Sequence, residues 1–189
     1  MVRIRRPRIG ITGSAGTGKT TLAGDLSRTL DLPLQEEWMR GRLAAGFDFH
    51  QLTREQHRRL LSDDADLLAG HLARADGMVT DRTPLDMAAF WLANGFGVDD
   101  PAATEALLAR AICAMADYSL VVLLPWGAMR IQADGVRSTN PWLQLHHHAV
   151  LEALCRRYVA GDRLLWLPDL PADPAVRCRV VRDRLATLS

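Results

Sequence analysis

This sequence has little lysine, little cysteine, no long apolar run and almost no net charge. Arginine makes up 22 of its 23 basic residues, and the single lysine is Lys19. A formal charge of +1 is too small for a protein that binds extended nucleic acid through its phosphates. The cysteines, Cys113, Cys155 and Cys178, are too far apart for a CxxC metal site, which indicates reduced thiols in a cytoplasmic protein. No apolar run reaches the roughly 18 residues of a membrane helix, so we expect no membrane span.

Strand-like and helix-like segments alternate along the chain. Its 189 residues, 48% of them hydrophobic, fit one domain over residues 1–189. Short apolar runs predict five strands, at Arg8–Thr12, Leu34–Glu37, Met78–Asp81, Tyr118–Leu124 and Arg163–Leu167. Helix starts are marked by capping residues, at Thr53, Thr83-Pro84, Asp100-Pro101, Asn140-Pro141 and Asp173-Pro174. This alternation predicts an α/β fold, a single three-layer domain with a five-stranded, mainly parallel sheet.

A phosphate loop is the most specific motif in the sequence. Gly13–Thr20 (GSAGTGKT) matches G-x-x-x-x-G-K-[ST] at every specified position, between a predicted strand and a predicted helix. Backbone N–H groups of such a loop surround nucleotide phosphates, Lys19 reaches the β- and γ-phosphates, and the Thr20 hydroxyl binds Mg²⁺. We therefore expect a P-loop NTPase domain with ATP and Mg²⁺ as cofactors. The predicted cofactor-binding residues here are Gly13, Ser14, Ala15, Gly16, Thr17, Gly18, Lys19, Thr20 and Thr21.

The position of the single lysine also excludes other nucleotide-binding classes. A guanine-reading NKxD motif needs a lysine outside the phosphate loop, and this chain has none. The transporter-ATPase signature LSGGQ is absent as well. A small-molecule kinase is then the leading class.

A second segment adds a family resemblance to this motif. With its phosphate loop, the chain resembles the P-loop nucleoside and nucleotide kinase superfamily, in particular the ribosylnicotinamide-kinase-like AAA-type P-loop domains. Glu36-Glu37-Trp38-Met39-Arg40 is similar to the E-[YW]-x-R segment of such domains. The resemblance implies that Glu37, or alternatively Glu36, accepts the proton of the attacking hydroxyl. It also implies that Glu36, Trp38 and Arg40 contact the substrate.

A third segment, Asp81-Arg82-Thr83, ends the third predicted strand and resembles the acidic-Arg-Ser/Thr motif of deoxynucleoside kinases. The resemblance implies that Asp81 holds Mg²⁺ through water, together with Thr20. It further implies that Arg82 clamps the acceptor or the transferred phosphate. We expect Asp86, five residues after Asp81, to be an ordinary first-turn charge of a helix.

The segment after the fourth predicted strand, about residues 125–139, is a long loop of the kind that forms lids. Related kinases close arginine-bearing lids over the phosphates, and here Arg137 fits best and Arg130 second. Nucleotide kinases carry several lid arginines in a tight cluster, and the departure here weakens the inference that the acceptor is itself a phosphorylated nucleotide. Asp169 follows the fifth predicted strand, where the superfamily places its adenine pocket.

Histidines and tryptophans provide weaker signals. His146-His147-His148 cannot form one metal-binding face on a helix, because consecutive residues point in different directions, so we interpret them as ordinary helical residues. Trp38 and Trp126 are predicted to lie in loops at the ligand edge, where each is able to stack on a flat acceptor.

Together these features predict an ATP- and Mg²⁺-dependent kinase that phosphorylates a hydroxyl of a nucleoside or nucleoside-like molecule. A nucleotide-binding switch protein without a small-molecule acceptor is one alternative. A kinase of a non-nucleoside metabolite or antibiotic is another. If the chain forms a homo-oligomer, a homodimer is the expected state.

Overall fold

The centre of the molecule is a parallel sheet. The computed structural model describes residues 6–48, 51–127, 139–169 and 173–188. The strands are β1 (Arg8–Thr12), β2 (Leu34–Gln35), β3 (Met78–Asp81), β4 (Leu120–Leu123) and β5 (Leu164–Trp166). They lie in the order β2-β3-β1-β4-β5, and every described pair is parallel. The predicted α/β fold with a five-stranded parallel sheet is confirmed.

β2 is shorter than the sequence predicts. It ends at Gln35 instead of Glu37, because Glu37 is already the N-cap of the following helix. The two glutamates therefore lie just beyond the carboxyl end of a strand. In open α/β sheets, this edge is where ligands bind.

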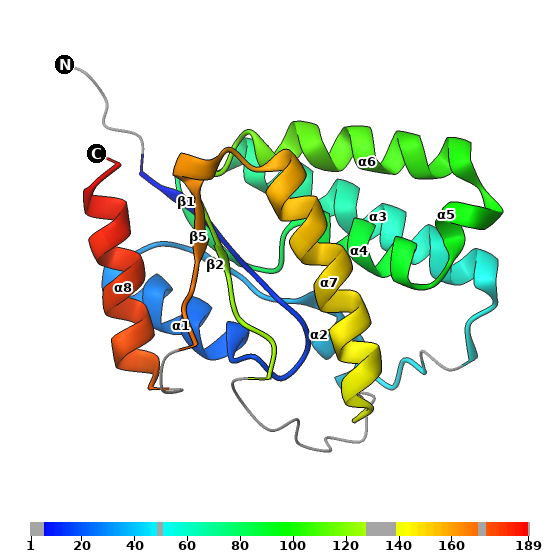
Figure 1. Cartoon of the computed structure of the whole chain (residues 1–189), viewed down its shortest axis with the longest axis horizontal. Coiled ribbons are helices and arrows are strands. Elements are labelled where there is room, and N and C mark those ends of the chain that lie inside the picture. Colours follow the sequence, from blue (N-terminus) through cyan, green and yellow to red (C-terminus); the bar gives the residue numbers. More distant parts are fainter. Residues whose placement is uncertain (1–5, 49–50, 128–138, 170–172, 189) are drawn as a thin grey trace.

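Helices cover both faces of the sheet (Figure 1). On one face, Leu22 of α1 and Val181 of α8 pack with Ile11 of β1. On the other face, Leu85 of α4 and Leu151 of α7 belong to a separate apolar core. The helices are α1 (Lys19–Leu30), α2 (Trp38–Ala44), α3 (Arg54–Arg74), α4 (Pro84–Ala93), α5 (Phe96–Asp99), α6 (Pro101–Met115), α7 (Pro141–Tyr158) and α8 (Pro174–Ala186), with a 3-10 turn at Gly161–Arg163.

Side-chain caps fix the helix starts where the sequence places them. The Thr53 hydroxyl accepts a hydrogen bond from the Gln56 N–H, and the Gln56 side chain accepts one from the Thr53 N–H, which completes a capping box. The carboxylate or amide oxygens of Asp100, Asn140 and Asp173 likewise accept first-turn N–H groups. These bonds satisfy donors that a helix leaves open at its N-terminus.

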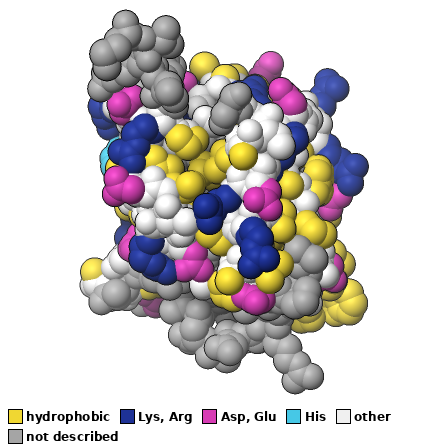
Figure 2. Space-filling view, turned by 90° about the vertical axis from the view of Figure 1, so that its left-hand side faces the viewer, with side chains coloured by type: hydrophobic (Ala, Val, Ile, Leu, Met, Phe, Trp, Pro, Cys, Tyr) yellow, Lys and Arg dark blue, Asp and Glu magenta, His cyan; other side chains and the backbone are white. Residues whose placement is uncertain are grey.

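Surface charge is mixed where it is seen. On the side of the molecule shown in Figure 2, described basic and acidic side chains lie interspersed among apolar ones. No helix within the described residue ranges is both long and apolar enough to cross a membrane.

Candidate active site

The phosphate loop joins β1 to α1, as the motif predicts. Gly18 is the N-cap of α1 in the left-handed region, at φ 91°, and no side chain caps the helix there. The first N–H groups of α1 thus face the loop instead of a capping side chain. A helix N-terminus in this state binds anions through its free donors and its dipole.

Lys19 lies buried beneath this loop. Its Nζ donates a hydrogen bond to the Ser14 carbonyl at 2.7 Å, and only 6% of the residue is exposed. Burial, together with repulsion from Arg82, lowers the pKa of Lys19 to about 8, although the carboxylates of Asp81 and Glu37 oppose both effects. A bound phosphate would place a further negative charge beside this ammonium and so favour its charged form.

Thr20 and Asp81 form the pair from which a metal site can be built. The Thr20 hydroxyl donates to Asp81 Oδ2 at 2.6 Å, and the other oxygen, Oδ1, is buried without a hydrogen-bond partner in the described structure. Hard oxygen ligands of this kind suit Mg²⁺, which keeps several waters and also binds substrate phosphates. The described residues contain no cluster of three or more His, Cys, Asp or Glu able to hold a metal by itself. The pair therefore fits an ion that is shared with a nucleotide.

Arg82 occupies the centre of the site in a strained conformation. Its φ of 91° is in the left-handed region, which costs a non-glycine residue about 1–2 kcal/mol. The guanidinium donates from Nε to Glu37 and from Nη1 to Asp86 Oδ1 at 3.2 Å, and its Cζ lies 4.9 Å from the Phe90 ring centroid. Burial by itself lowers the pKa of Arg82, but the carboxylates of Glu37, Asp86 and Asp81 together raise it by a larger amount. The strain is therefore held in place by two carboxylates.

Asp86 is not the ordinary helix charge that the sequence suggested. The residue has no exposed surface, because four groups surround its carboxylate. Oδ2 accepts hydrogen bonds from the Thr12 hydroxyl at 2.6 Å, the Thr83 N–H at 2.8 Å and the Thr83 hydroxyl at 2.9 Å, while Oδ1 accepts from Arg82. Asp86 thus ties β1 to the turn after β3. The capping spacing Thr83–Asp86 was the available signal for part of this role.

Of the two adjacent glutamates after β2, one reaches Arg82 in the candidate site. Glu37 reaches Arg82, whereas Glu36 is exposed and the structure gives it no contact there. Trp38 is the first residue of α2 and meets the His71 ring edge-on at 5.7 Å between centroids, so its predicted loop position is wrong. Trp126 does lie in a turn, after β4. The Arg40 backbone lies in α2, and its side chain is outside the described part of the structure.

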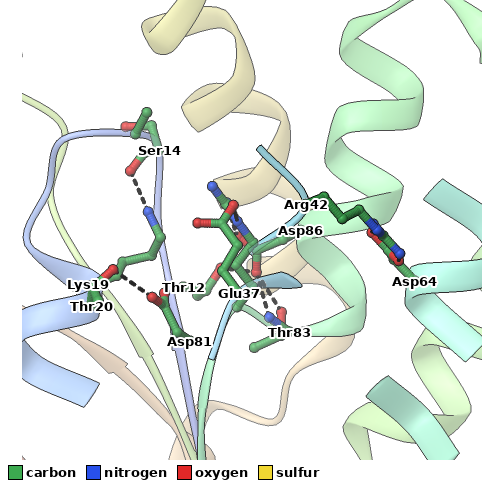
Figure 3. Close-up of polar contacts among 12 residues, drawn as sticks. Thr12, Ser14, Lys19, Thr20, Glu37, Arg42, Asp64, Asp81, Thr83 and Asp86 are labelled. Carbon is green, nitrogen blue, oxygen red and sulfur yellow. Dashed lines mark hydrogen bonds and ion pairs between the residues drawn. The ribbon is translucent and has the colours of Figure 1, made fainter. Parts of the chain in front are cut away.

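Another arginine of α2 has a partner that the sequence did not indicate. Arg42 makes a two-bond ion pair with Asp64 of α3, at 2.6 Å and 2.5 Å. Figure 3 shows this pair apart from Lys19, Thr20 and Asp81, with Glu37, Thr83 and Asp86 between the two groups. Because 22 residues separate Arg42 from Asp64, no local pattern signals the contact.

Two further residues support the phosphate loop from other helices. Gln144 of α7 accepts a hydrogen bond from the Ala15 N–H at 3.2 Å, and the buried Arg177 of α8 donates to the Thr17 carbonyl at 2.7 Å. Asp169 is exposed after β5 and raises the pKa of Arg177, which burial lowers more strongly. Sequence reasoning missed both Gln144 and Arg177.

The predicted lid lies mostly outside the described residues. Arg130 and Arg137 both fall in the segment 128–138, so their roles stay predictions. The described structure continues from β4 as far as Gly127 and resumes at residue 139, just before α7.

Comparison with known proteins gives a family and a fold. A model of the AAA domain family matches residues 8–161. A search of curated proteins found no matching sequence.

Solved structures share the fold at low identity. NadR protein in complex with NR has a TM-score of 0.68 and 18% identity over 97% of this chain, and the match covers 52% of that chain. Deoxyadenosine kinase from M. mycoides, with dCMP and dCDP bound, has a TM-score of 0.64 and 14% identity, over 96% of this chain and all of that one. Shikimate kinase from Acinetobacter baumannii has a TM-score of 0.56 and 15% identity, over 96% and 94%. The chain thus spans about half of NadR, and these identities show a common fold alone.

Proposed function

The chain belongs to the AAA domain family, and from this premise we propose that it is an ATP- and Mg²⁺-dependent kinase. Its acceptor, in this proposal, is a hydroxyl of a nucleoside or nucleoside-like molecule. The carrying observation is the meeting of three segments at one edge of the sheet. The phosphate loop follows β1, Asp81 and Arg82 lie at the carboxyl end of β3, and Glu37 follows β2. These three strands are neighbours in the sheet, and Thr20–Asp81 and Glu37–Arg82 contacts join the segments.

The proposed chemistry assigns each group a task. Lys19 and the loop N–H groups hold the triphosphate, and Mg²⁺, when bound near Thr20 and Asp81, neutralises charge on its phosphates. Glu37 accepts the proton of the acceptor hydroxyl while the oxygen of that hydroxyl bonds to the γ-phosphorus. The bond from that phosphorus to the bridging oxygen breaks, and ADP leaves with the electron pair. Arg82 orients Glu37 and offers positive charge to the phosphoryl group in transit.

The charges around Glu37 favour an uncharged acceptor. Arg42 and Arg82, the described arginines that flank this region, are each paired with a carboxylate. An acceptor with its own carboxylate or phosphate would have to displace one of these pairs, at the cost of an unpaired buried charge. Deoxyadenosine kinase, whose fold this chain shares, is named for a nucleoside. Shikimate kinase, with the same fold, keeps an acidic acceptor as the alternative to test.

The test is ADP release from ATP and Mg²⁺ with a panel of acceptors. The panel holds nucleosides, nucleoside monophosphates, sugars, hydroxy acids and antibiotic alcohols. We expect a nucleoside to stimulate release most, with nucleoside monophosphates and hydroxy acids well below it. If no compound stimulates release, the kinase proposal fails and the switch-protein alternative takes its place.

Glu37→Gln distinguishes the two alternatives directly. The amide keeps the size of the side chain but cannot accept the proton, so we expect acceptor-stimulated ADP release to fall about 10²–10⁴-fold. Binding of ATP should stay within about twofold of the parent, because Glu37 lies on the acceptor side. Glu36→Gln is the matched control and should retain stimulation. Equal rates for Glu37→Gln and the parent would contradict the role of Glu37 as base.

A further inference from the structure

One face of α7 lies against the candidate active site. Its buried polar residues, Gln144, His147 and His148, are spaced three and four positions apart, while His146 is exposed. Gln144 accepts the Ala15 N–H of the phosphate loop, which places this face beside the position of the phosphates. The exposed His146 and the buried pair His147 and His148 thus lie on different sides of the helix. Of the buried pair, His147 is the one whose ring stacks on Phe90, the residue that also contacts Arg82.

His147 is a buried polar side chain whose ring nitrogens make no well-formed hydrogen bond to a described residue. The residue is 4% exposed, and neither ring nitrogen has a hydrogen-bond partner of acceptable geometry in the described part of the chain. Its ring stacks on Phe90, with 4.0 Å between centroids and 19° between planes. Buried donors and acceptors in folded proteins are ordinarily hydrogen-bonded, and leaving them unsatisfied is costly, so the arrangement indicates a ligand that completes them.

The charges around His147 are those of the phosphate-transfer site. Burial, together with the nearby charges of Arg82 and Lys19, lowers the pKa of His147 to about 3, against an opposing contribution from the Asp86 backbone. The imidazole is therefore neutral at ordinary pH and offers one N–H donor and one lone pair. Phe90 connects it to Arg82, whose guanidinium lies over the same ring.

We propose that His147 donates a hydrogen bond from its neutral imidazole to an oxygen of the γ-phosphate. Gln144 places α7 against the phosphate loop, and Phe90 places His147 beside Arg82, so the imidazole lies between the loop and the acceptor side. A group bound between Lys19 and Arg82 is expected to be anionic. An N–H donor there suits a phosphoryl oxygen better than it suits an uncharged hydroxyl.

This inference rests on the proposed nucleotide site but not on the acceptor. Its test compares Kd for AMP-PNP and for ADP, each with Mg²⁺, by calorimetry. His147→Phe keeps a ring on Phe90 and removes the N–H, so we expect about tenfold weaker binding of AMP-PNP and less than a twofold change for ADP. His147→Asn, which retains an N–H donor, should recover part of the loss. His146→Phe, on the exposed side of the same helix, should match the parent.

Two results would overturn the proposal. An equal loss of affinity for AMP-PNP and for ADP in His147→Phe would mean that the ring has only a structural role. No loss of either would mean that His147 makes no phosphate contact.

A measurement on the parent protein keeps the test independent of folding. With ¹⁵N-labelled histidine, AMP-PNP should shift the ring N–H resonance of His147 toward a hydrogen-bonded position, while ADP should leave it near the nucleotide-free value. Identical responses to the two nucleotides would contradict the inference. Loss of acceptor stimulation in the panel would instead count against the kinase function and leave the AMP-PNP to ADP comparison valid.

Discussion

The two halves of the candidate site are built in opposite ways. In the phosphate loop, the Lys19 ammonium bonds, among the described residues, to a carbonyl of its own loop, and the first N–H groups of α1 have no capping side chain. Across the site, Asp86 uses both oxygens on protein donors, and Arg82 is held between Glu37 and Asp86. The first half, the ligand-directed half, keeps its polar groups for a ligand, whereas the second half, the fold-directed half, satisfies its polar groups within the protein. Substitutions in the first half should therefore lower activity, and those in the second should also lower stability.

Lys19→Ala should have the largest effect, and on activity alone. Removing the ammonium that faces the β- and γ-phosphates should lower turnover at least about 10³-fold. Stability should change by less than about 1 kcal/mol, because the buried cation is repelled by Arg82 and the Ser14 carbonyl keeps its bond from Thr17. Rates of ADP release and urea unfolding check the two parts. A large loss of stability would erase the contrast between the halves.

Asp86→Ala should show the reverse pattern. The substitution leaves Arg82, Thr12 and Thr83 with unsatisfied buried donors, and we expect a loss of about 3–5 kcal/mol in the free energy of unfolding. Urea denaturation measures it. Asp66→Ala is the matched control, since Asp66 pairs with Arg110 at 2.8 Å in an ion pair that is about half exposed and should cost less than about 1 kcal/mol. Similar losses of unfolding free energy in the two variants would show that the buried network of Asp86 contributes no more to stability than an exposed ion pair.

The same contrast explains which parts of the site the sequence predicts. The phosphate loop is predictable because its groups are contiguous, and eight residues fix both their identity and their spacing. Asp86 depends on Thr12, which is 74 positions away, and Arg177 depends on Thr17, which is 160 positions away. Such contacts come from the packing of α4 on the sheet and of α8 beside α1, and no local pattern encodes them.

The fold is more predictable than the site for a related reason. Strand runs and capping residues are local signals, and Thr53, Asp100, Asn140 and Asp173 begin helices as predicted. The errors fall at the junction between β2 and α2. The apolar run predicts a strand as far as Glu37, but Glu37 is the N-cap residue of α2, and Trp38, predicted to lie in a loop, is the first residue of that helix.

The pH dependence of nucleotide binding provides a sharper test of the ligand-directed half. With a pKa of about 8 in the nucleotide-free protein, Lys19 loses its proton as the pH rises past that value. Phosphates favour the charged form, so binding must restore the proton, and affinity for AMP-PNP should fall about tenfold per pH unit above pH 8. Calorimetry in buffers of different ionisation enthalpy should show proton uptake at pH 9. Lys19→Ala should bind weakly without this slope, and a parent with flat affinity to pH 10 would contradict the low pKa.

Stability should rise with pH over the range in which the affinity for nucleotide falls. The pKa of Lys19 in the folded protein is below its usual value of 10.5, so the unfolded chain binds more protons between about pH 8 and 10.5. The contribution of Lys19 to the free energy of unfolding therefore rises with pH in this window. The difference in unfolding free energy between the parent and Lys19→Ala isolates that contribution. A constant difference from pH 7 to 10 would contradict the assignment.

Thr12→Val should have the smallest effect, and it tests how much the bond from β1 contributes to the hydrogen-bond network of Asp86. Valine fills the same space as threonine but cannot donate the 2.6 Å bond to Asp86 Oδ2. Asp86 keeps its bonds to Thr83 and Arg82, so the unfolding free energy should fall by only about 1 kcal/mol. ADP release should change by less than about threefold, because Arg82 is still held between its two carboxylates. A large loss of activity with intact stability would mean that the fold-directed half also depends on fine positioning from β1, and the division between the halves would then be one of degree.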